Sequence, residues 1–111
     1  MIAAAPDAGD IVWISLDPQA GHEQAGRRPA VVLTPKRYNQ ASGLCIAVPV
    51  TGKIKGFPFE TPLPEGLPVS GVVLTDHLKS LDWEARRAEV VGRVPEYVLD
   101  DIRAKLKPLL F

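Results

Sequence analysis

The sequence predicts a mainly β fold, a small curled sheet or partly open barrel, closed by one C-terminal α-helix. Apolar residues fall into several short runs that are separated by turns rich in glycine and proline, of which the chain has 9 and 11. Apolar spacing typical of an amphipathic helix occurs at the end of the chain, over residues 95–110. The length of 111 residues is that of one domain, so we expect residues 1–111 to form a single domain.

Several short strands are expected along the chain. In the first, at residues 11–16, apolar side chains occupy one face at every second position. Pro49 indicates an edge strand or a strand end, because proline cannot donate a hydrogen bond to a neighbouring strand. Residues 38–43 form a connection with room for one helical turn. The expected strands are residues 11–16, 30–33, 44–50, 59–61, 71–75, 78–81 and 89–91.

The end of the chain has a different pattern. Pro95 suits the first turn of a helix. Acidic and basic side chains at Asp100 and Arg103, and at Asp101 and Lys105, have the spacing of neighbours on a solvated helix face. The opposite face is apolar at helical spacing, through Val98, Leu99, Ile102, Leu106, Leu109 and Leu110.

Charge is unevenly distributed, although 13 basic and 13 acidic residues give a formal net charge of zero. Residues 1–26 have four acidic side chains and no Lys or Arg, whereas residues 27–59 have six basic side chains and no Asp or Glu. A basic third of a neutral chain indicates a surface for an anionic partner. Basic side chains that are simply solvated remain the alternative.

Composition excludes several classes of protein. Cys45 is the single cysteine and cannot form an internal disulfide, which favours a reducing, cytoplasmic location over a secreted scaffold. No apolar run approaches the ~18 residues of a membrane span, and the start of the chain lacks the basic and apolar segments of a signal peptide. We expect no metal and no other cofactor, because the histidines and the cysteine are far apart and no carboxylate cluster resembles a magnesium site.

The first candidate for chemistry is the polar stretch at residues 17–29, which has turn-forming residues at both ends and no apolar period. It holds His22, Glu23 and Arg28. Phosphodiester transfer needs groups of these kinds, namely a base for the attacking hydroxyl, a proton donor for the leaving oxygen and a cation for the charged transition state. Arginine suits the last role because its fork matches two phosphate oxygens. An exposed charged turn without catalytic function is the alternative.

The second candidate is the segment of residues 51–57. Thr51, Lys53 and Lys55 offer a hydroxyl and two ammonium groups to a phosphate backbone, and Phe57 offers a ring on which a base can stack. The alternative is a solvated loop, with Phe57 and Phe59 packed into the core. The glycine spacing is not that of a nucleotide-phosphate loop.

Other residues carry weaker signals. Asp76 and His77 are adjacent, and adjacent strand residues point to opposite faces, so they are expected to make a poor catalytic dyad. Cys45 lies in an apolar run and is expected to be a small buried hydrophobe. Trp13 and Trp83 are expected to be core or interface residues and not stacking platforms for bases.

One motif is more specific than any of these patterns, Gly21-His22-Glu23-Gln24-Ala25-Gly26-Arg27-Arg28-Pro29. The chain that carries it resembles the MazF/PemK (Kid) toxins of toxin–antitoxin operons, in order and over nearly its whole length. The likeness extends to residues 9–13, 17–18, 30–32, 48–51, 55–59, 71–76 and 82–86, and to the terminal helix.

The resemblance implies the small SH3-like curled barrel of the MazF/PemK/CcdB-type toxins, and a homodimer. It implies a sequence-specific endoribonuclease that cleaves single-stranded RNA, including mRNA, without the ribosome. The substrate's own 2′-hydroxyl is then the nucleophile, and the products carry a 2′,3′-cyclic phosphate and a 5′-hydroxyl. The implied partner is a cognate MazE-like antitoxin, whose acidic and extended C-terminal part occupies the RNA groove. No membrane is implied.

Family positions also imply roles for individual residues. Arg28 matches the essential arginine, Thr51 the catalytic threonine and Glu23 the glutamate of the same loop, so these three are expected to be catalytic. The RNA site of the Kid branch also includes a histidine, an aspartate and an arginine that this chain matches. Together with the basic and aromatic residues nearby, the expected RNA contacts are His22, Gln24, Lys53, Lys55, Phe57, Asp76, Lys79 and Arg86.

The chain departs from the Kid branch at Leu74, where that branch has an arginine that pairs with the aspartate at position 76. Serine is frequent at position 22 of MazF-type members, so His22 is expected to have a secondary role. The loop beyond Thr51 and residues 60–70 are expected to set the RNA sequence preference. A non-enzymatic CcdB-like toxin that poisons a protein such as DNA gyrase shares the barrel type and is the alternative function, and an inert peptide-binding module is a third.

Overall fold

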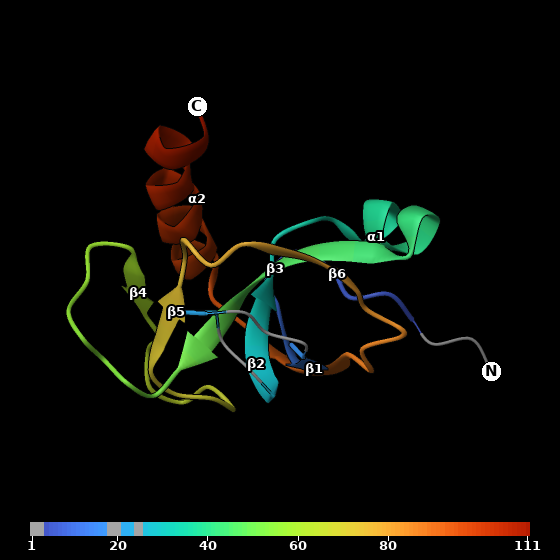
Figure 1. Ribbon diagram of the computed structural model, residues 1–111, viewed down its shortest axis with the longest axis horizontal. Helices are drawn as coiled ribbons and strands as arrows, with labels where there is room; N and C mark the ends of the chain where they lie inside the picture. Colours follow the sequence, from blue (N-terminus) through green and yellow to red (C-terminus); the bar gives the residue numbers. More distant parts are fainter. Residues whose placement is uncertain (1–3, 18–20, 24–25) are drawn as a thin grey trace.

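The computed structural model describes residues 4–17, 21–23 and 26–111. A curled antiparallel sheet forms the body, and the C-terminal helix stands beside its β4 and β5 strands (Figure 1). The elements are β1 Asp10–Ser15, β2 Arg27–Val32, α1 Lys36–Ser42, β3 Leu44–Thr51, β4 Glu60–Pro62, β5 Val72–Leu74, β6 Lys79–Asp82, β7 Glu89–Arg93 and α2 Glu96–Leu110. The predicted fold class, mainly β with a C-terminal helix, is confirmed.

The strand β3 is the centre of the sheet. The strand order is β4-β5-β3-β2-β1-β7, and β6 pairs with β3 outside this path. Residues 44–47 of β3 pair with β6, residues 47–49 pair with β2, and residues 50–51 pair with β5. The expectation that Pro49 marks an edge strand or a strand end is therefore wrong. Pro49 pairs with Ala30 of β2 on one side of β3. On the other side it falls between the segments that pair with β6 and with β5, so neither of these two ladders needs an N–H from it and a proline is tolerated.

The two faces of the sheet bury two apolar clusters. Alternate residues of a strand point to opposite faces, and the register aligns Ile11, Val31 and Val48 in one row across β1, β2 and β3. This row belongs to the cluster covered by α2, which contributes Val98, Leu99, Ile102 and Leu106. Val12 and its neighbours on the other face pack with Cys45, Leu81 and Trp83. The apolar face predicted for the C-terminal helix is thus the face that docks it on the sheet, as far as Leu106; Leu109 and Leu110 are exposed.

The helix α1 is longer than the single turn expected in this region. It spans Lys36–Ser42 and ends at Gly43, which has the left-handed φ of 75° that a helix C-terminus favours in glycine. Its anchor is the buried Asn39, whose Nδ2 donates to the carbonyls of Pro6 at 2.8 Å and Thr34 at 2.9 Å. The indole Nε1 of Trp83 donates to the Asn39 carbonyl at 2.8 Å. Trp83 is therefore a core residue, as predicted.

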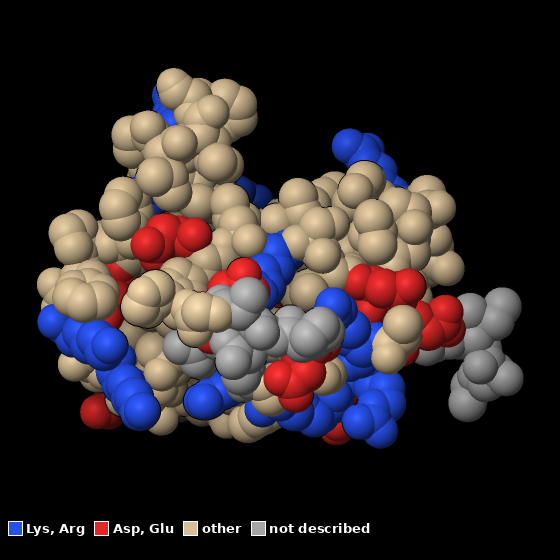
Figure 2. Space-filling model, in the orientation of Figure 1, with Lys and Arg blue, Asp and Glu red and all other residues tan. Residues whose placement is uncertain are grey.

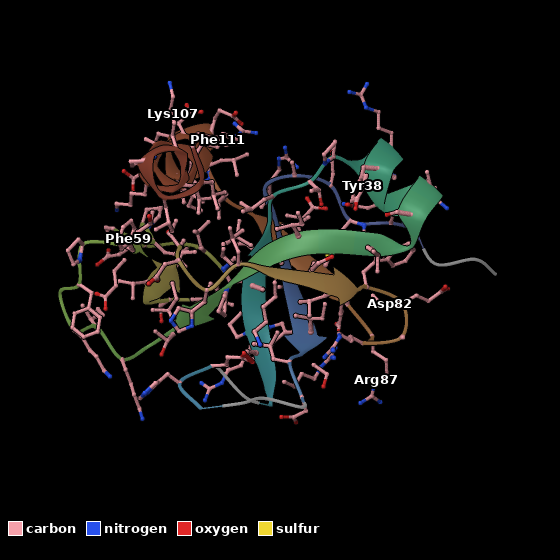
Figure 3. The ribbon with its side chains drawn as sticks, turned by 45° about the horizontal axis from the view of Figure 1, so that its top comes forward. Tyr38, Phe59, Asp82, Arg87, Lys107 and Phe111 are labelled. Atoms are coloured by element: carbon pink, nitrogen blue, oxygen red, sulfur yellow. The ribbon has the colours of Figure 1, made fainter. Side chains whose placement is uncertain are left out.

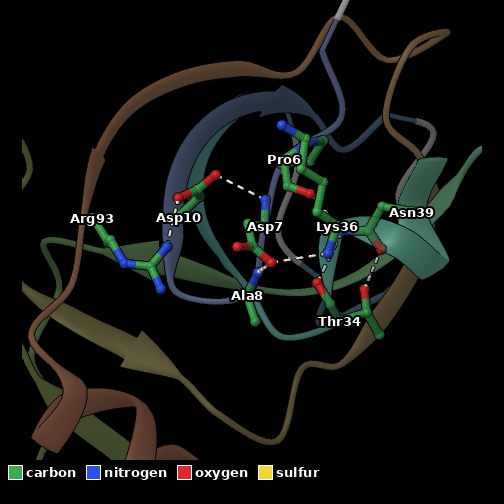
Figure 4. A network of polar contacts seen from close by, with 8 residues as sticks. All are labelled: Pro6, Asp7, Ala8, Asp10, Thr34, Lys36, Asn39 and Arg93. Atoms are coloured by element: carbon green, nitrogen blue, oxygen red, sulfur yellow. Dashed lines mark hydrogen bonds and ion pairs between the residues drawn. The ribbon is translucent and has the colours of Figure 1, made fainter.

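Polar contacts also fasten the N-terminal segment to α1 and β7 (Figure 4). The Asp7 carboxylate accepts from the backbone N–H of Lys36 and of Ala8, both at 2.9 Å, and these bonds lower the pKa of Asp7 below its ordinary 3.8. Asp10 accepts from the backbone N–H of Asp7 at 2.8 Å and from the Arg93 guanidinium at 3.1 Å. The first described residues are thereby held in place by carboxylates.

Within the described ranges, neither helix is long and apolar enough to cross a membrane. The same residues contain no cluster of three or more His, Cys, Asp or Glu side chains that could hold a metal ion.

Candidate functional site

Two adjoining hollows are lined by residues of the end of β3 and the loop after it, of the turn after β5 and of the β1–β2 connection. The first has a volume of about 400 Å³ and the second about 410 Å³. They share three lining residues, His22, Asp76 and His77. The first is also lined by Thr51, Lys53, Lys55, Phe57, Glu60 and Leu74, and the second by Glu23, Leu78 and Lys79. Of the eleven predicted site residues, six line the first hollow, and Glu23 and Lys79 line the second.

Thr51 is the last residue of β3 and pairs with Val72 of β5. Its side chain is buried at the wall of the first hollow, and its Oγ1 accepts from the backbone N–H of Lys53 at 3.2 Å. The backbone of Gly71 passes so close that a Cβ there would lie 2.1 Å from the Thr51 carbonyl oxygen. Gly71 also has a φ of +118°, which residues with side chains rarely adopt. The position of Thr51 therefore depends on a glycine opposite it.

Glu60 holds the loop that follows β3. Its two carboxylate oxygens accept from the backbone N–H groups of Lys55 at 3.1 Å and Gly56 at 3.0 Å, and its own N–H donates to the Phe57 carbonyl at 3.0 Å. Glu60 is buried, and its carbonyl accepts from the Lys105 ammonium of α2 at 2.8 Å. The sequence analysis gave this glutamate no role. A buried carboxylate that fixes a loop through backbone bonds leaves no pattern in the sequence.

The loop presents its cationic and aromatic side chains to solvent. Lys53 and Lys55 are exposed, and Phe57 is 59% exposed with the Lys55 ammonium 5.8 Å from its ring centroid. Packing of Phe57 into the core, the alternative left open by the sequence, is thereby excluded. Phe59 is half-buried beside β4 (Figure 3). Phe57 is accordingly the ring that a base can reach.

Asp76 and His77 lie in the turn after β5, and both line both hollows. The expectation that they point to opposite faces is wrong because β5 ends at Leu74. A backbone bond from the His77 N–H to the Leu74 carbonyl, at 3.0 Å, closes the turn. His77 therefore lines the candidate site, although the sequence analysis gave it no role there.

The two adjacent arginines of the motif lie at the start of β2, where Arg27 pairs with Ser15 and Arg28 with Ile14. In an extended strand their side chains point to opposite sides. The Arg27 guanidinium donates to the Arg87 carbonyl at 2.8 Å and to the Arg86 carbonyl at 3.5 Å. Arg27 is exposed, and its guanidinium also holds the β6–β7 connection through these two carbonyls. Arg28 is exposed and lines neither hollow.

Arg86 and Asp17 fasten the base of the β1–β2 connection. The Arg86 guanidinium donates to the Asp17 carbonyl at 2.6 Å and the Ser15 carbonyl at 3.1 Å. The Asp17 carboxylate accepts from the backbone N–H of Gly26 at 2.9 Å. Arg86, expected to contact RNA, lines neither hollow and instead supports the segment that carries His22. Gln24, another expected RNA contact, lies outside the described residues.

An ion pair joins this segment to β6. The Lys79 ammonium lies 2.6 Å from the Glu23 carboxylate, with 18% of the lysine side chain and 46% of the glutamate side chain exposed. Both residues line the second hollow. Cys45, by contrast, is fully buried in the sheet, and burial raises the pKa of its thiol to about 11. The predicted reading of Cys45 as a small hydrophobe is confirmed.

Basic side chains surround this part of the molecule. In Figure 2 lysine and arginine side chains spread along the lower rim of the face, on both sides of the grey residues. Arg87 points away from the body (Figure 3). A hollow with a hydroxyl, two imidazoles and two ammonium groups, beside an exposed ring, suits a polyanion whose bases can stack.

Comparison with known proteins identifies the family of this chain. A family model described as the PemK-like, MazF-like toxin of type II toxin–antitoxin systems matches residues 7–110. The endoribonuclease toxin MazF of Escherichia coli (strain K12) is 48% identical over 105 residues, which are 95% of this chain and 94% of that protein.

Solved structures agree with the family match. The crystal structure of MazF from Deinococcus radiodurans superposes with a TM-score of 0.94 at 56% identity and covers 97% of this chain and 98% of that chain. A MazE–MazF structure from the same organism gives a TM-score of 0.88 at 56% identity, with 97% of each chain covered. The chain therefore belongs to the PemK-like, MazF-like toxin family of type II toxin–antitoxin systems, whose curated relatives are endoribonucleases.

Proposed function

We propose that the protein is a sequence-specific endoribonuclease toxin that cleaves single-stranded RNA, including mRNA, without a metal ion. The observation that carries this proposal is the first hollow, in which Thr51, Lys53 and Lys55 lie beside an exposed Phe57 on a chain of this family. Lysines suit the phosphates, and the ring suits a base. We further propose that residues 1–111 act as one domain and work in the cytoplasm, where mRNA is translated.

In the proposed reaction the substrate's 2′-hydroxyl attacks the adjacent phosphorus. The new O2′–P bond forms, the P–O5′ bond breaks, and the products are a 2′,3′-cyclic phosphate and a 5′-hydroxyl. Arg28 is the cation that stabilises the extra charge of the transition state, since its fork can bind two phosphate oxygens. Thr51 donates a hydrogen bond to a phosphate oxygen, and Glu23 orients the attacking hydroxyl by accepting a hydrogen bond from it. The proton that O2′ loses passes to solvent, and solvent supplies the proton that O5′ gains.

RNA binding is assigned to the side chains around this centre. Lys53, Lys55 and Phe57 are exposed at the first hollow, and His22 and Asp76 line both. Gln24 is proposed from the motif alone. Lys79 and Arg86 are proposed to act through the segment they hold, because Lys79 is paired with Glu23 and Arg86 with the Ser15 and Asp17 carbonyls.

We propose two protein partners. The first is a MazE-like antitoxin, supported by the solved MazE–MazF complexes of relatives. An acidic, extended segment of that antitoxin would compete with RNA for the basic rim. The second partner is another copy of this chain, as a homodimer. The alternative of a CcdB-like poison of a protein target is not favoured, because the matched relatives are curated endoribonucleases.

Incubation of the protein with a long RNA in EDTA tests the function directly. We expect discrete fragments that end in a cyclic phosphate. Replacing the 2′-hydroxyl on the 5′ side of the cut by hydrogen removes the nucleophile and should abolish cleavage. Intact RNA would refute the endoribonuclease, and cleavage of the 2′-deoxy substrate would refute the mechanism.

A further inference from the structure

The ion pairs within α2 have different surroundings. Arg103 lies 3.4 Å from the carboxylates of Glu96 and Asp100, on the same helix, and more than half of each of these side chains is exposed. Lys105 lies 2.8 Å from the Asp101 carboxylate, but only 25% of the lysine side chain is exposed. The pair of Lys105 and Asp101 is turned toward β4, beside which α2 stands (Figure 1).

The Lys105 ammonium has three acceptors, which matches its three hydrogens. They are the Glu60 carbonyl at 2.8 Å, the Thr61 Oγ1 at 3.1 Å and an Asp101 carboxylate oxygen at 2.8 Å. Glu60 and Thr61 are buried and are the first two residues of β4. Lys105 therefore holds the start of β4 from the side of the helix.

One line of these contacts leads from the helix to the loop after β3. The Glu60 carbonyl accepts from Lys105, and the carboxylate of the same residue accepts from the loop. The two loop donors are the backbone N–H groups of Lys55 at 3.1 Å and Gly56 at 3.0 Å. Lys55, Phe57 and Glu60 line the first hollow. The helix is thus joined to this wall of the hollow through a single residue of β4.

A second line of contacts leads to the turn after β5. Thr61 Oγ1 donates its one hydrogen to the Asp101 carboxylate at 2.9 Å and accepts from Lys105. Its remaining bond, to the Thr75 hydroxyl at 3.1 Å, is therefore one in which Thr75 donates. Thr75 is fully buried and immediately precedes Asp76, which lines both hollows. The helix therefore also holds the wall that carries Asp76.

We propose that Lys105 and Asp101 of α2 are positioning residues of the RNA site, a proposal that rests on the proposed function. They fix two walls of the first hollow from behind, the loop after β3 through Glu60 and the turn after β5 through Thr75. Neither residue lines either hollow, so both act only through the residues that they hold. Those walls carry residues proposed to bind RNA. Loss of the contacts should therefore weaken RNA binding and leave the cleavage rate of bound RNA unchanged.

Lys105→Met tests this, because methionine keeps most of the apolar stem and removes the ammonium. Affinity for a labelled 2′-deoxy RNA should fall by about tenfold, while the single-turnover cleavage rate at saturating protein stays that of the wild type. Arg103→Met is the matched control, since it removes one positive charge from the same helix but breaks only exposed pairs. It should change affinity by less than about twofold. Charge alone predicts equal losses in the two variants.

Hydrogen exchange of individual amides gives a readout that needs no RNA. The N–H groups of Lys55 and Gly56 donate to Glu60, so both should exchange faster in Lys105→Met than in Arg103→Met. The amides of β1 should exchange at the wild-type rate in both variants. A general loss of stability would instead speed exchange throughout the sheet, and that result would overturn the proposal.

Asp101→Asn repeats the test without a change in side-chain size, so the proposal stays testable if Lys105→Met does not fold. Asp100→Asn is its control on the exposed side of the helix. Both remove a negative charge, which by itself favours a polyanion, yet Asp101→Asn should weaken RNA binding and Asp100→Asn should not.

The proposal is overturned if a variant and its control bind RNA equally, or if the Lys55 and Gly56 amides exchange as in the wild type. A slower cleavage rate at saturating protein with unchanged affinity also overturns it. A wild-type protein that neither binds nor cleaves RNA would instead refute the proposed function, and the exchange rates would still show whether α2 holds the loop.

Discussion

Glu60→Gln tests whether a buried carboxylate orders the loop after β3, which is proposed to bind RNA. The substitution keeps the size of the side chain and removes its charge. In the wild type two carboxylate oxygens accept from the N–H groups of Lys55 at 3.1 Å and Gly56 at 3.0 Å. An amide has one acceptor oxygen, so one bond is lost and an NH₂ group faces a backbone donor. A hydrogen bond to a charged group contributes about 1.5–3 kcal/mol.

The loss should appear in RNA binding more than in global stability. Residues 52–58 are exposed, so loop opening exposes little of the core. If RNA binds only the ordered loop, the loss of about 1.5–3 kcal/mol of the free energy that orders the loop weakens RNA binding by roughly tenfold to a hundredfold. Fluorescence anisotropy with a labelled 2′-deoxy RNA measures this. Charge alone predicts the opposite sign, because Glu60→Gln removes a negative charge from a site for a polyanion.

Two further variants complete the test. Glu65→Gln makes the same change of charge at an exposed residue of a neighbouring segment, and it should leave affinity unchanged or slightly raise it. Phe57→Ala combined with Glu60→Gln should weaken binding by less than the two single effects together, since both act through one loop. An affinity of Glu60→Gln equal to or above that of the wild type would refute the reasoning, and so would strict additivity with Phe57→Ala.

Three other predictions follow from the contacts described. Arg28→Lys keeps the charge but loses the guanidinium fork, so single-turnover cleavage should slow on the order of a hundredfold. The same change at Arg37 on α1 should leave the cleavage rate unchanged, and equal losses in the two variants would contradict the role of Arg28. Asn39→Ala leaves the Pro6 and Thr34 carbonyls without their buried donor, so the free energy of unfolding in urea should fall by about 2–4 kcal/mol. A fall of less than about 1 kcal/mol would show that α1 does not depend on this side chain. The pKa values of Asp7 and Asp101 are lowered, the first by the backbone N–H of Lys36 and the second by the Lys105 ammonium. The unfolded state therefore binds more protons in acid than the folded state does, so the free energy of unfolding should fall as the pH drops below about 4. Asp7→Asn should make the urea midpoint depend less steeply on pH.

The parts of the fold that sequence predicted are those that apolar periodicity determines. Val12, Ile14 and Leu16, at every second position, belong to one cluster as their alternation predicted, and α2 docks through the face that its helical spacing marks. The helix α1 was underestimated because it has no apolar stripe and is anchored by Asn39 through bonds to Pro6 and Thr34. Those bonds are tertiary and leave no periodic signal.

The site was predicted in part for a similar reason. Four residues predicted from the motif, from the segment of residues 51–57 and from the family resemblance line one hollow, namely His22, Thr51, Lys53 and Lys55. His77 was missed because its side chain direction depends on where β5 ends, which is set by pairing with β3 and β4 and not by residue type. The contacts of Arg27 were not predicted because its acceptors are backbone carbonyls some sixty residues away. Every residue has a backbone carbonyl, so the sequence does not show which carbonyl a side chain will contact.

Gly71 makes the proposed catalytic centre dependent on a residue that has no chemistry of its own. A methyl group at this position would occupy the space 2.1 Å from the Thr51 carbonyl oxygen, on a backbone whose φ of +118° already disfavours it. Gly71→Ala would therefore displace Thr51 while every charged and nucleophilic side chain stays in the chain. Such a variant is a practical form for producing the protein in living cells, because growth arrest by an active toxin selects against its expression. Its use can be judged by colony yield beside that of the wild type and by retained binding of the antitoxin.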